Sequence, residues 1–428
     1  MSINDVFSLN EGAEVTIRGW VYRKRELRDK VFLVVRDGSG IIQAVIDKSN
    51  QDSWDIASKL NIESSIVLTG IVRREPRAPG GSEVHVERID WYYVGNPFPI
   101  NEDAAKADSE YLLDIRHLWV RSRKMWAVLR VRHTVFSAIH EFFRSRGYFE
   151  VQGPMFVSAA VEGGATLFPV KYFDRDVYLT QSSQFYLEVL IYVLEKVYTV
   201  APSFRAESSR TRRHLTEFWH AEAEEAWLQF DGLLNLLEDL ITYIVDKVLG
   251  ERREELKLLN RNTKILENTK PPFYRVSYDE AIEVLQRKGL NIKWGDDIGA
   301  DEERALTLEF DKPVLLHHFP EKIKAFYHRN DPSRPETTLS VDVLAPEGYG
   351  EIVGGGERIY DYEELLSKIK RFGLKSEDYD WYLDLRRFGS VPHAGFGLGV
   401  DRLVMWICGL DHIRDAIPFP RDVRRVRP

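Results

Sequence analysis

Basic side chains are concentrated in one short stretch of the chain, between Val200 and Trp227. An apolar run ends at Arg205 and Glu207, and a loop follows that carries basic residues: Arg210, Arg212, Arg213 and His214. Guanidinium groups bind phosphate oxygens bidentately, and a ring such as that of Phe218 can stack on a base. The pattern predicts a strand–loop–strand that binds a polyphosphate; the alternative is a solvated hairpin with a basic tip.

Two carboxylates precede a run of three glycines in the last third of the chain. Asp342 and Glu351 lie just before Gly354–Gly356, in the segment V-D-V-L-A-P-E-G-Y-G-E-I-V-G-G-G. Mg²⁺ is usually held by one or two carboxylates together with phosphate oxygens. We therefore expect Asp342 and Glu351 to be Mg²⁺ ligands beside a bound polyphosphate.

A second anion site is predicted near the C-terminus, where V-P-H-A-G-F-G-L-G-V-D-R-L reads as a strand, a glycine turn and a helix from about Val400. Backbone amides at Gly397 and Gly399, the helix N-terminus and Arg402 could together bind an anion. The spacing of these glycines is not that of a dinucleotide-binding fold, and the chain has no G-x-x-x-x-G-K-[ST] phosphate loop.

The composition describes an ordinary globular protein with a local, not general, affinity for nucleic acid. The chain has 428 residues, a net charge of -8 and 44% hydrophobic residues. Its one cysteine, Cys408, excludes an internal disulfide framework and a cysteine-rich zinc site. The N-terminus does not read as a secretory signal, and no segment is long and apolar enough to span a membrane. We expect a cytoplasmic protein.

Residues 1–95 read as a small β domain with strands of alternating polarity and a D-G-S-G turn. If Arg36 pairs with Ile41 across that turn, Phe32 and Gln43 become neighbours on one face, where a ring can stack on a base and an amide can read its edge. Arg28 belongs to a basic loop beside them. An OB-fold is predicted; the alternative is a plain β-barrel with a solvated basic loop.

Residues 96–123 read as a linker, because proline-rich sequence is followed by a polar acidic run. A larger domain, 124–428, opens with an amphipathic helix to about Arg146, then Gly147 and a strand to Pro154. Helix and strand could belong to the core or to a subunit interface. Further along, His317 and His318 are neighbours in a predicted strand and should face opposite ways, which makes them poor co-ligands.

These motifs resemble the three motifs of the class II aminoacyl-tRNA synthetases. Motif 1 corresponds to about 130–154, motif 2 to about 200–227 and motif 3 to about 393–408. With the OB-like domain ahead of them, the chain resembles the aspartyl, asparaginyl and lysyl subgroup over nearly its whole length. T-Q-S-S-Q-F-Y-L-E, R-T-R-R-H-L-T-E-F-W-H-A-E and D-L-R-R-F-G-S-V-P-H-A-G-F-G-L-G resemble asparaginyl enzymes of the archaeal type.

The resemblance implies an α+β fold: an N-terminal OB-fold barrel that binds the anticodon, and a class II catalytic domain with an antiparallel sheet flanked by helices. It also implies a homodimer through the helix from Lys124 and the strand ending at Pro154. The implied reaction activates asparagine with ATP to asparaginyl-adenylate and transfers it to tRNA(Asn), with Mg²⁺ as cofactor.

Site residues are carried over by position in the motifs. The family's catalytic residues correspond to Arg205, Glu351 and Arg402. Its ATP-binding positions correspond to Arg205, Glu207, Arg213, His214, Leu215, Phe218, Glu351, Gly399, Val400, Asp401 and Arg402. Its amino-acid-binding positions correspond to Glu162, Gln184, Leu187, Glu222 and Arg358. The anticodon-binding positions are Phe32, Gln43 and Arg28, and the metal ligands are Glu351 and Asp342. Asp401 departs from the family pattern, which usually has glutamate there.

The choice of amino acid depends on Leu187 and Glu222. Aspartyl relatives usually carry a lysine where this chain has Leu187, and an aspartate where it has Glu222. An aspartate substrate about 4 Å from Glu222 would be repelled by roughly 4 kcal/mol at an effective dielectric near 20. An amide, in contrast, can donate to Glu222 and accept from Arg358. Asparagine is therefore favoured.

Three alternatives remain open. One is an aspartyl enzyme that also charges tRNA for asparagine, against which Leu187 argues. Another is a synthetase-derived asparagine synthetase, which would lack the anticodon domain that this chain has. The third is a non-catalytic RNA-binding paralogue, although Arg205, Glu351 and Arg402 are all present.

Overall fold

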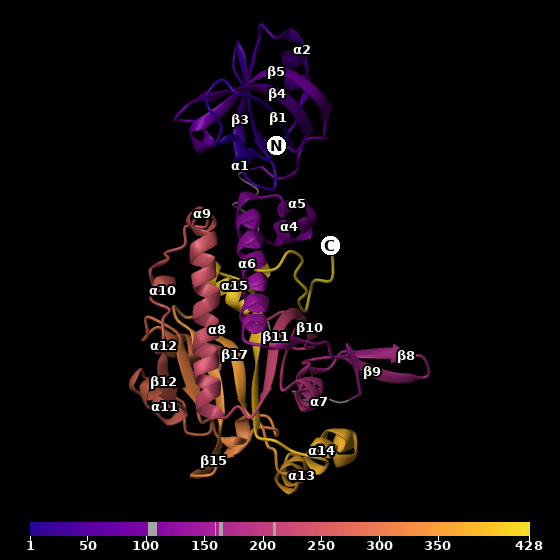
Figure 1. The fold of residues 1–428 in the computed structure, drawn as a ribbon, viewed down its shortest axis with the longest axis vertical. Helices are drawn as coiled ribbons and strands as arrows, with labels where there is room; N and C mark the ends of the chain where they lie inside the picture. The colour runs from indigo at the N-terminus through magenta and orange to yellow at the C-terminus, as the bar shows by residue number, and fades with distance from the viewer. Residues whose placement is uncertain (102–108, 159, 162–165, 209–210) are drawn as a thin grey trace. The chain divides into compact units, whose positions relative to one another are not determined.

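The computed structural model describes residues 1–101, 109–158, 160–161, 166–208 and 211–428 (Figure 1). The chain divides into two compact units, Met1–Leu112 and Leu113–Pro428, which are described separately below. The division falls within the 96–123 segment predicted as a linker. Part of that segment lies outside the described residues, and the rest contains two short helices: α4 (Ser109–Asp114) and α5 (Arg116–Trp119).

The first unit is a closed five-stranded barrel with the strand order β1-β2-β3-β5-β4. Its elements are α1 (Ile3–Val6), β1 (Glu14–Glu26), β2 (Lys30–Arg36), β3 (Ile41–Asp47), α2 (Gln51–Lys59), β4 (Ser65–Arg74) and β5 (Ser82–Tyr93). Alternate residues of β2 enter the barrel core, where Val31, Leu33 and Val35 are fully buried. Arg36 pairs with Ile41 as predicted, so the register expected for this hairpin is confirmed.

An eight-stranded sheet forms the centre of the second unit, in the order β12-β13-β16-β17-β18-β11-β10-β6. Its strands are β6 (Phe149–Glu150), β10 (Lys196–Phe204), β11 (Glu217–Ala226), β12 (Tyr274–Ser277), β13 (Val314–His317), β16 (Ser340–Ala345), β17 (Gly350–Glu357) and β18 (His393–Gly399). The central strands pair antiparallel, as predicted.

The sheet is antiparallel at its centre and parallel at both edges. β12 pairs parallel with β13 and β6 pairs parallel with β10. Helices α11 (Tyr278–Arg287) and α12 (Ala300–Thr307) connect β12 to β13, and α7 (Gln184–Leu194) lies between β6 and β10. Such helical crossovers allow neighbouring strands to run in the same direction.

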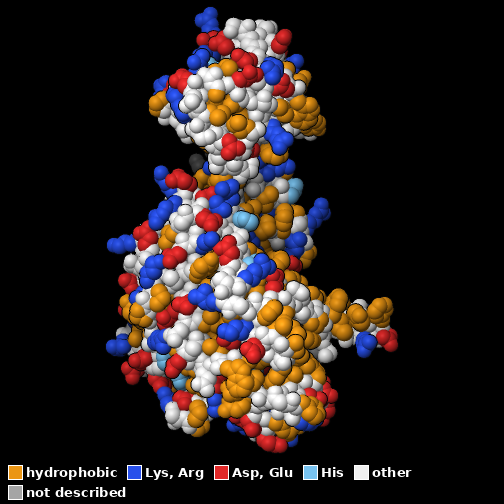
Figure 2. Space-filling view, viewed as in Figure 1, with side chains coloured by type: hydrophobic (Ala, Val, Ile, Leu, Met, Phe, Trp, Pro, Cys, Tyr) orange, Lys and Arg blue, Asp and Glu red, His pale blue; other side chains and the backbone are white. Residues whose placement is uncertain are grey.

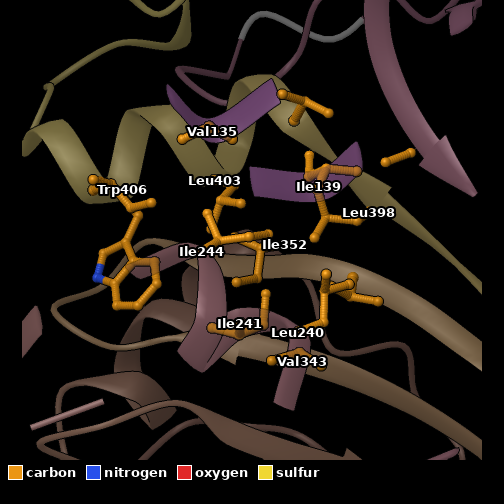
Figure 3. Packing of buried hydrophobic residues seen from close by; sticks show 14 of the residues in the cluster. Val135, Ile139, Leu240, Ile241, Ile244, Val343, Ile352, Leu398, Leu403 and Trp406 are labelled. Atoms are coloured by element: carbon orange, nitrogen blue, oxygen red, sulfur yellow. The ribbon is translucent and has the colours of Figure 1, made fainter. Parts of the chain in front are cut away.

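Three helices cover one face of the sheet: α6 (Arg123–Ser145), α8 (Phe230–Glu251) and α15 (Val400–Cys408). Figure 3 shows their apolar side chains meeting those of the strands, and its labelled residues are Val135, Ile139, Leu240, Ile241, Ile244, Val343, Ile352, Leu398, Leu403 and Trp406. The side chain of Ser122 caps α6 by accepting from the backbone N–H of Met125, and Gly147 follows its end with φ +78°. This agrees with the helix predicted from the sequence.

The remaining elements surround this sheet. They are β7 (Phe156–Val157), β8 (Pro169–Tyr172), β9 (Arg175–Leu179), α9 (Arg253–Leu258), α10 (Lys264–Glu267), β14 (Asn330–Asp331), β15 (Arg334–Thr338), α13 (Tyr362–Arg371) and α14 (Asp380–Arg387). β7, β9 and β8 form a small separate sheet. Among the helices that the structure describes, none has the length and apolar character needed to cross a membrane.

Candidate functional site

The floor of the site is a row of residues that lie side by side across four strands. Asp342 on β16 pairs with Gly354 on β17, Gly354 pairs with Gly397 on β18, and Gly397 pairs with Glu222 on β11. The two carboxylates are thus three strand spacings apart, about 14 Å, and two glycines separate them. The row leaves an open cleft between two acidic ends.

One end of the cleft collects most of the predicted ATP-binding residues. Its lining includes Arg205, Glu207, Arg213, His214, Leu215, Phe218, Glu351, Gly399, Asp401 and Arg402. They come from the loop between β10 and β11 and from β11, β17, β18 and α15. Val400 is placed differently: it is fully buried in the core cluster rather than at the cleft. Arg210 lies outside the described residues.

Each of three cations at this end contacts a carboxylate. Arg402 Nη1 donates to Glu351 Oε2 at 2.9 Å, and Lys324 Nζ donates to both oxygens of Asp342 at 2.8 and 2.7 Å. In the third pair, Arg213 contacts both oxygens of Glu303 on α12, with Nη2 to Oε1 at 2.9 Å. The three pairs are balanced in charge, so an anionic ligand would enter a site whose positive groups are already positioned.

The charge states follow from these contacts. Burial would raise the pKa of Glu351, but Arg402, Lys324 and Arg213 together hold it at about 2, so this carboxylate is ionised. Burial, together with the nearby Arg402 and Arg213, lowers the pKa of His214 to about 4. His214 is therefore neutral at neutral pH and adds no charge to the site.

An aromatic surface lies beside the first arginine of the motif. Arg205 directly follows β10 and Phe218 lies on the paired strand β11, and the guanidinium carbon of Arg205 lies 5.3 Å from the centre of the Phe218 ring. The ring lines the same pocket as Arg205, Glu207 and His214. A flat π-surface next to cations suits a ligand that has both a base and phosphates.

A wider cavity, with a volume of about 790 Å³, extends from Arg205 and Glu351 to the other end of the cleft, where the predicted residues Gln184, Glu222 and Arg358 line it. Glu222 accepts hydrogen bonds from the hydroxyl of Ser182 and from the backbone N–H of Ser183 at 2.8 Å. Arg358 donates from Nη2 to Glu224 at 2.6 Å. Burial raises the pKa of Glu224 to about 8 despite its contact with Arg358, so Glu224 is mostly protonated at neutral pH and does not add a full negative charge to this end.

One of the described residues predicted to bind the amino acid, Leu187, is not found at the cleft. The Leu187 side chain is fully buried and packs in an apolar cluster with Ile191, Val197, Ala226 and Val391. Its assignment as a binding residue is therefore corrected to a packing residue, because helix α7 directs this side chain into the core. Glu162 lies outside the described residues.

The barrel carries the predicted surface for bases. Phe32 and Gln43 lie diagonally on the outer face of β2 and β3, and Arg28 is exposed in the turn before β2. Gln43 Nε2 donates to Glu83 Oε2 at 2.7 Å, and Glu83 also contacts His85 Nε2 at 2.8 Å. Glu83 was missed from the sequence because only the parallel pairing of β3 with β5 brings it beside Gln43.

Comparison with known families agrees with this division of the chain. Residues 108–423 match the family described as tRNA synthetases class II (D, K and N). Residues 15–91 match the family described as OB-fold nucleic acid binding domain. The two matches correspond to the sheet-containing unit and to the barrel.

Individual relatives match over nearly the whole length. The asparagine–tRNA ligase of Pyrococcus abyssi is 52% identical over 98% of this chain and 97% of its own length. The crystal structure of asparaginyl-tRNA synthetase from Pyrococcus horikoshii complexed with asparaginyl-adenylate is 50% identical, covers 100% of this chain and 99% of its own, and superimposes with a TM-score of 0.97. The asparaginyl-tRNA synthetase of Entamoeba histolytica is 36% identical, covers 99% of this chain and 98% of its own, and has a TM-score of 0.89.

Proposed function

Because the chain belongs to the class II tRNA synthetases and, within them, to the asparagine–tRNA ligases, we propose that its cleft activates asparagine with ATP for transfer to tRNA(Asn). The observation that carries this proposal is the row Asp342–Gly354–Gly397–Glu222, which joins the end with the arginines and Glu351 to a polar end with Gln184 and Arg358. A reaction between the two ligands would take place over the two glycines.

The chemistry requires positioning and charge more than proton transfer. The carboxylate oxygen of asparagine attacks the α-phosphorus of ATP, the bond to the β-phosphate oxygen breaks, and pyrophosphate leaves with its electron pair. Arg205 and Arg402 offset the negative charge that develops on the phosphate oxygens. A ribose hydroxyl at the end of the tRNA then attacks the adenylate carbonyl, which releases AMP.

The donor set near Gly354 fits a Mg²⁺ ion. A Cβ atom built on Gly354 would lie 3.2 Å from Glu351 Oε1 and 3.5 Å from Asp342 Oδ1, so both carboxylates face the same space. Two hard oxygen donors plus phosphate oxygens are what Mg²⁺ requires. Glu351 and Asp342 would hold the ion, which would supply charge stabilisation to the phosphates when bound.

Selectivity for asparagine over aspartate would come from the charge at the polar end. Glu222 and Arg358 both line the cleft, and Glu224 accepts hydrogen bonds from the Arg358 guanidinium. A carboxylate substrate would be repelled by Glu222, whereas an amide can donate to Glu222 and accept from Arg358. This favours asparagine over the aspartyl alternative.

The barrel would bind the anticodon, with Phe32 stacking on a base and Gln43 reading its edge. Glu83 holds the Gln43 amide so that its NH₂ group faces the carboxylate. The amide oxygen is then the end left to accept from a base. Since charging tRNA serves translation, we also propose that the protein acts in the cytoplasm.

We further propose that the protein is a homodimer, as its relatives' motif 1 implies. Figure 2 shows hydrophobic side chains gathered over the projecting β8–β9 hairpin, where Tyr172 and Phe173 are 36% and 85% exposed; Phe156 on the neighbouring strand β7 is 49% exposed. Exposed aromatic groups of this size usually mark an interaction surface. Sedimentation should show a dimer for the wild-type protein and a weaker dimer for Phe173→Asp. A monomeric wild type would refute this proposal.

The deciding experiment for the function is ATP–pyrophosphate exchange with asparagine, aspartate, lysine or no amino acid. We expect exchange with asparagine alone. Exchange with aspartate would favour the aspartyl or amidating alternatives. If folded protein binds tRNA but shows no exchange with any amino acid, the non-catalytic alternative is correct.

A further inference from the structure

A buried carboxylate lies one helical turn after Gln184 on α7. Glu188 is fully buried, and its two oxygens accept hydrogen bonds from four side chains. The donors and their distances to Glu188 are Gln184 Nε2 at 3.0 Å, Tyr382 OH at 2.8 Å, Arg386 Nη2 at 2.6 Å and His393 Nε2 at 2.9 Å. None of these residues but Gln184 is assigned a role above.

The contact with Glu188 fixes the orientation of the Gln184 amide. An ionised carboxylate can only accept hydrogen bonds, so the NH₂ end of Gln184 must face Glu188. Its oxygen is then the end left for the cleft, which Gln184 lines. An oxygen accepts a hydrogen bond from an ammonium group, whereas an NH₂ group in the same place would repel it. The two orientations of the Gln184 amide thus have nearly the same shape, but only the one with its oxygen towards the cleft can bind an ammonium group.

Glu188 is itself held rigidly. Burial would raise its pKa, but Arg386 and His393 hold the pKa well below its usual value, so it is ionised. Arg386 makes a second contact: its Nε donates to the carbonyl of Ile359 at 2.8 Å. Ile359 is the next residue after Arg358. His393 adds a link to the start of β18, where its own carbonyl accepts from the backbone N–H of Arg358 at 2.9 Å.

The Phe185 ring joins the same arrangement from α7. It stacks on Tyr382 with ring centres 4.2 Å apart, and Tyr186 stacks on Trp381 of α14 at 5.4 Å. The start of α7, the helix α14 and the segment of Arg358 are therefore packed around one carboxylate. A displacement of any of them would move Glu188 and with it the Gln184 amide.

We propose that Glu188 is a positioning residue for asparagine binding: it turns the Gln184 amide so that its oxygen receives the α-ammonium group of the substrate. This rests on the proposed function, in which Gln184 binds that group. Glu188 does not touch the substrate, so its effect must pass through Gln184. That requirement makes the proposal testable by a double-mutant cycle.

The cycle uses Glu188→Gln, Gln184→Met and the double variant, in the full-length protein. Glu188→Gln keeps the shape but can present a donor to Gln184. We expect it to raise the KM for asparagine in pyrophosphate exchange roughly tenfold or more, the size of a lost hydrogen bond to a charged group, with the KM for ATP unchanged. In the Gln184→Met background the same change should alter the KM for asparagine by less than about twofold. Calorimetric binding of asparagine should give the same pattern.

Two further variants separate positioning from a general loss of structure. Tyr382→Phe removes one donor to Glu188 without a change in charge, and its smaller rise in KM should also vanish in the Gln184→Met background. Glu224→Gln, a change at another buried carboxylate, should instead remain additive with Gln184→Met. If the effects of Glu188→Gln or Tyr382→Phe add to those of Gln184→Met, the proposal is wrong. A wild type without asparagine-dependent exchange would overturn the proposed function itself.

Discussion

The carboxylate of Asp401 on α15 forms a buried ion pair with the guanidinium of Arg132 on α6. Its second oxygen accepts from the backbone N–H of Trp219 on β11 at 2.7 Å. Asp401 thus ties together the predicted motifs 1, 2 and 3. The family's usual glutamate is one methylene longer, and here the shorter side chain makes both contacts.

Replacement of Asp401 by asparagine should destabilise the second unit strongly. It leaves Arg132, which is 7% exposed, buried without a counter-charge, and such losses cost about 3–5 kcal/mol. Chemical unfolding followed by tryptophan fluorescence would measure this. The matched control is Asp239→Asn, which removes the exposed partner of Arg146 and should cost under about 1 kcal/mol. Equal losses in the two variants would contradict this account of Asp401.

Replacement of Glu222 by glutamine should weaken the preference for asparagine over aspartate. It removes the carboxylate that would repel an aspartate side chain, so the ratio of kcat/KM values for the two amino acids should fall by roughly tenfold or more, a change of about 1.4 kcal/mol. Exchange assays with each amino acid give the ratio. Glu225→Gln, on the opposite face of the same strand, should leave it unchanged.

Replacement of Glu351 by glutamine should raise the Mg²⁺ concentration that gives half-maximal exchange, by roughly tenfold or more. Asp342→Asn should have a smaller effect, because Lys324 contacts both Asp342 oxygens, whereas Arg402 contacts only Oε2 of Glu351. A titration with Mg²⁺ at fixed ATP distinguishes the two variants. A Mg²⁺ dependence that neither change alters would exclude both residues as ligands.

Replacement of Phe32 by alanine should weaken tRNA binding without affecting activation of asparagine. Loss of one stacked base costs about 1–3 kcal/mol, so the KM for tRNA should rise roughly 5- to 150-fold. Pyrophosphate exchange without tRNA should be unchanged. Trp91→Ala is the control, because Trp91 is an aromatic residue, 54% exposed, on β5 of the same barrel. If Trp91→Ala lost as much tRNA affinity as Phe32→Ala, any exposed aromatic residue of the barrel would serve, and Phe32 would have no specific role.

Acidification should destabilise the second unit partly through His317. Burial and the adjacent His318 together lower the pKa of His317 to about 4. The folded pKa is below that of the unfolded chain, near 6.5, so the stabilisation is complete above pH 6.5 and is lost as the pH falls towards 4. Between pH 6 and 5, the slope of the free energy of unfolding against pH should be smaller by about 1.4 kcal/mol per pH unit in His317→Phe than in the wild type. An unchanged slope in urea titrations would show that His317 protonates normally.

The sequence was most informative where chemistry or register restricts the choice of residue. Phosphate binding favours arginine, so Arg205, Arg213 and Arg402 were identified from type and spacing, and the structure gathers them at one end of the cleft. The pairing of Arg36 with Ile41 was predictable from the turn, and it fixed Phe32 and Gln43 on one face. Their roles as ligand contacts remain predictions.

The partners of those residues could not be predicted, because they are neighbours only in the folded chain. Glu303 and Lys324 lie in no motif, and Glu188 and Glu224 lie in motif segments without a predicted role, yet each contacts a predicted site residue. Likewise, His317 and His318 were expected to face opposite ways, and this was wrong. β13 ends at His317, and His318 turns back with φ +59°, so the two Nδ1 atoms lie 2.6 Å apart.

The paired glycines of β17 and β18 are among the least replaceable residues of the chain, although glycine is the smallest residue. Gly356 pairs with Gly395, and a methyl group at Gly395 would lie 2.1 Å from Cδ of Glu224 and one at Gly397 would lie 2.4 Å from Nε2 of His220. The gaps in these strands are filled by side chains of the neighbouring strand. Tolerance to mutation should therefore be lowest at these glycines. Replacement by alanine, a small change at most positions, would be a large perturbation here.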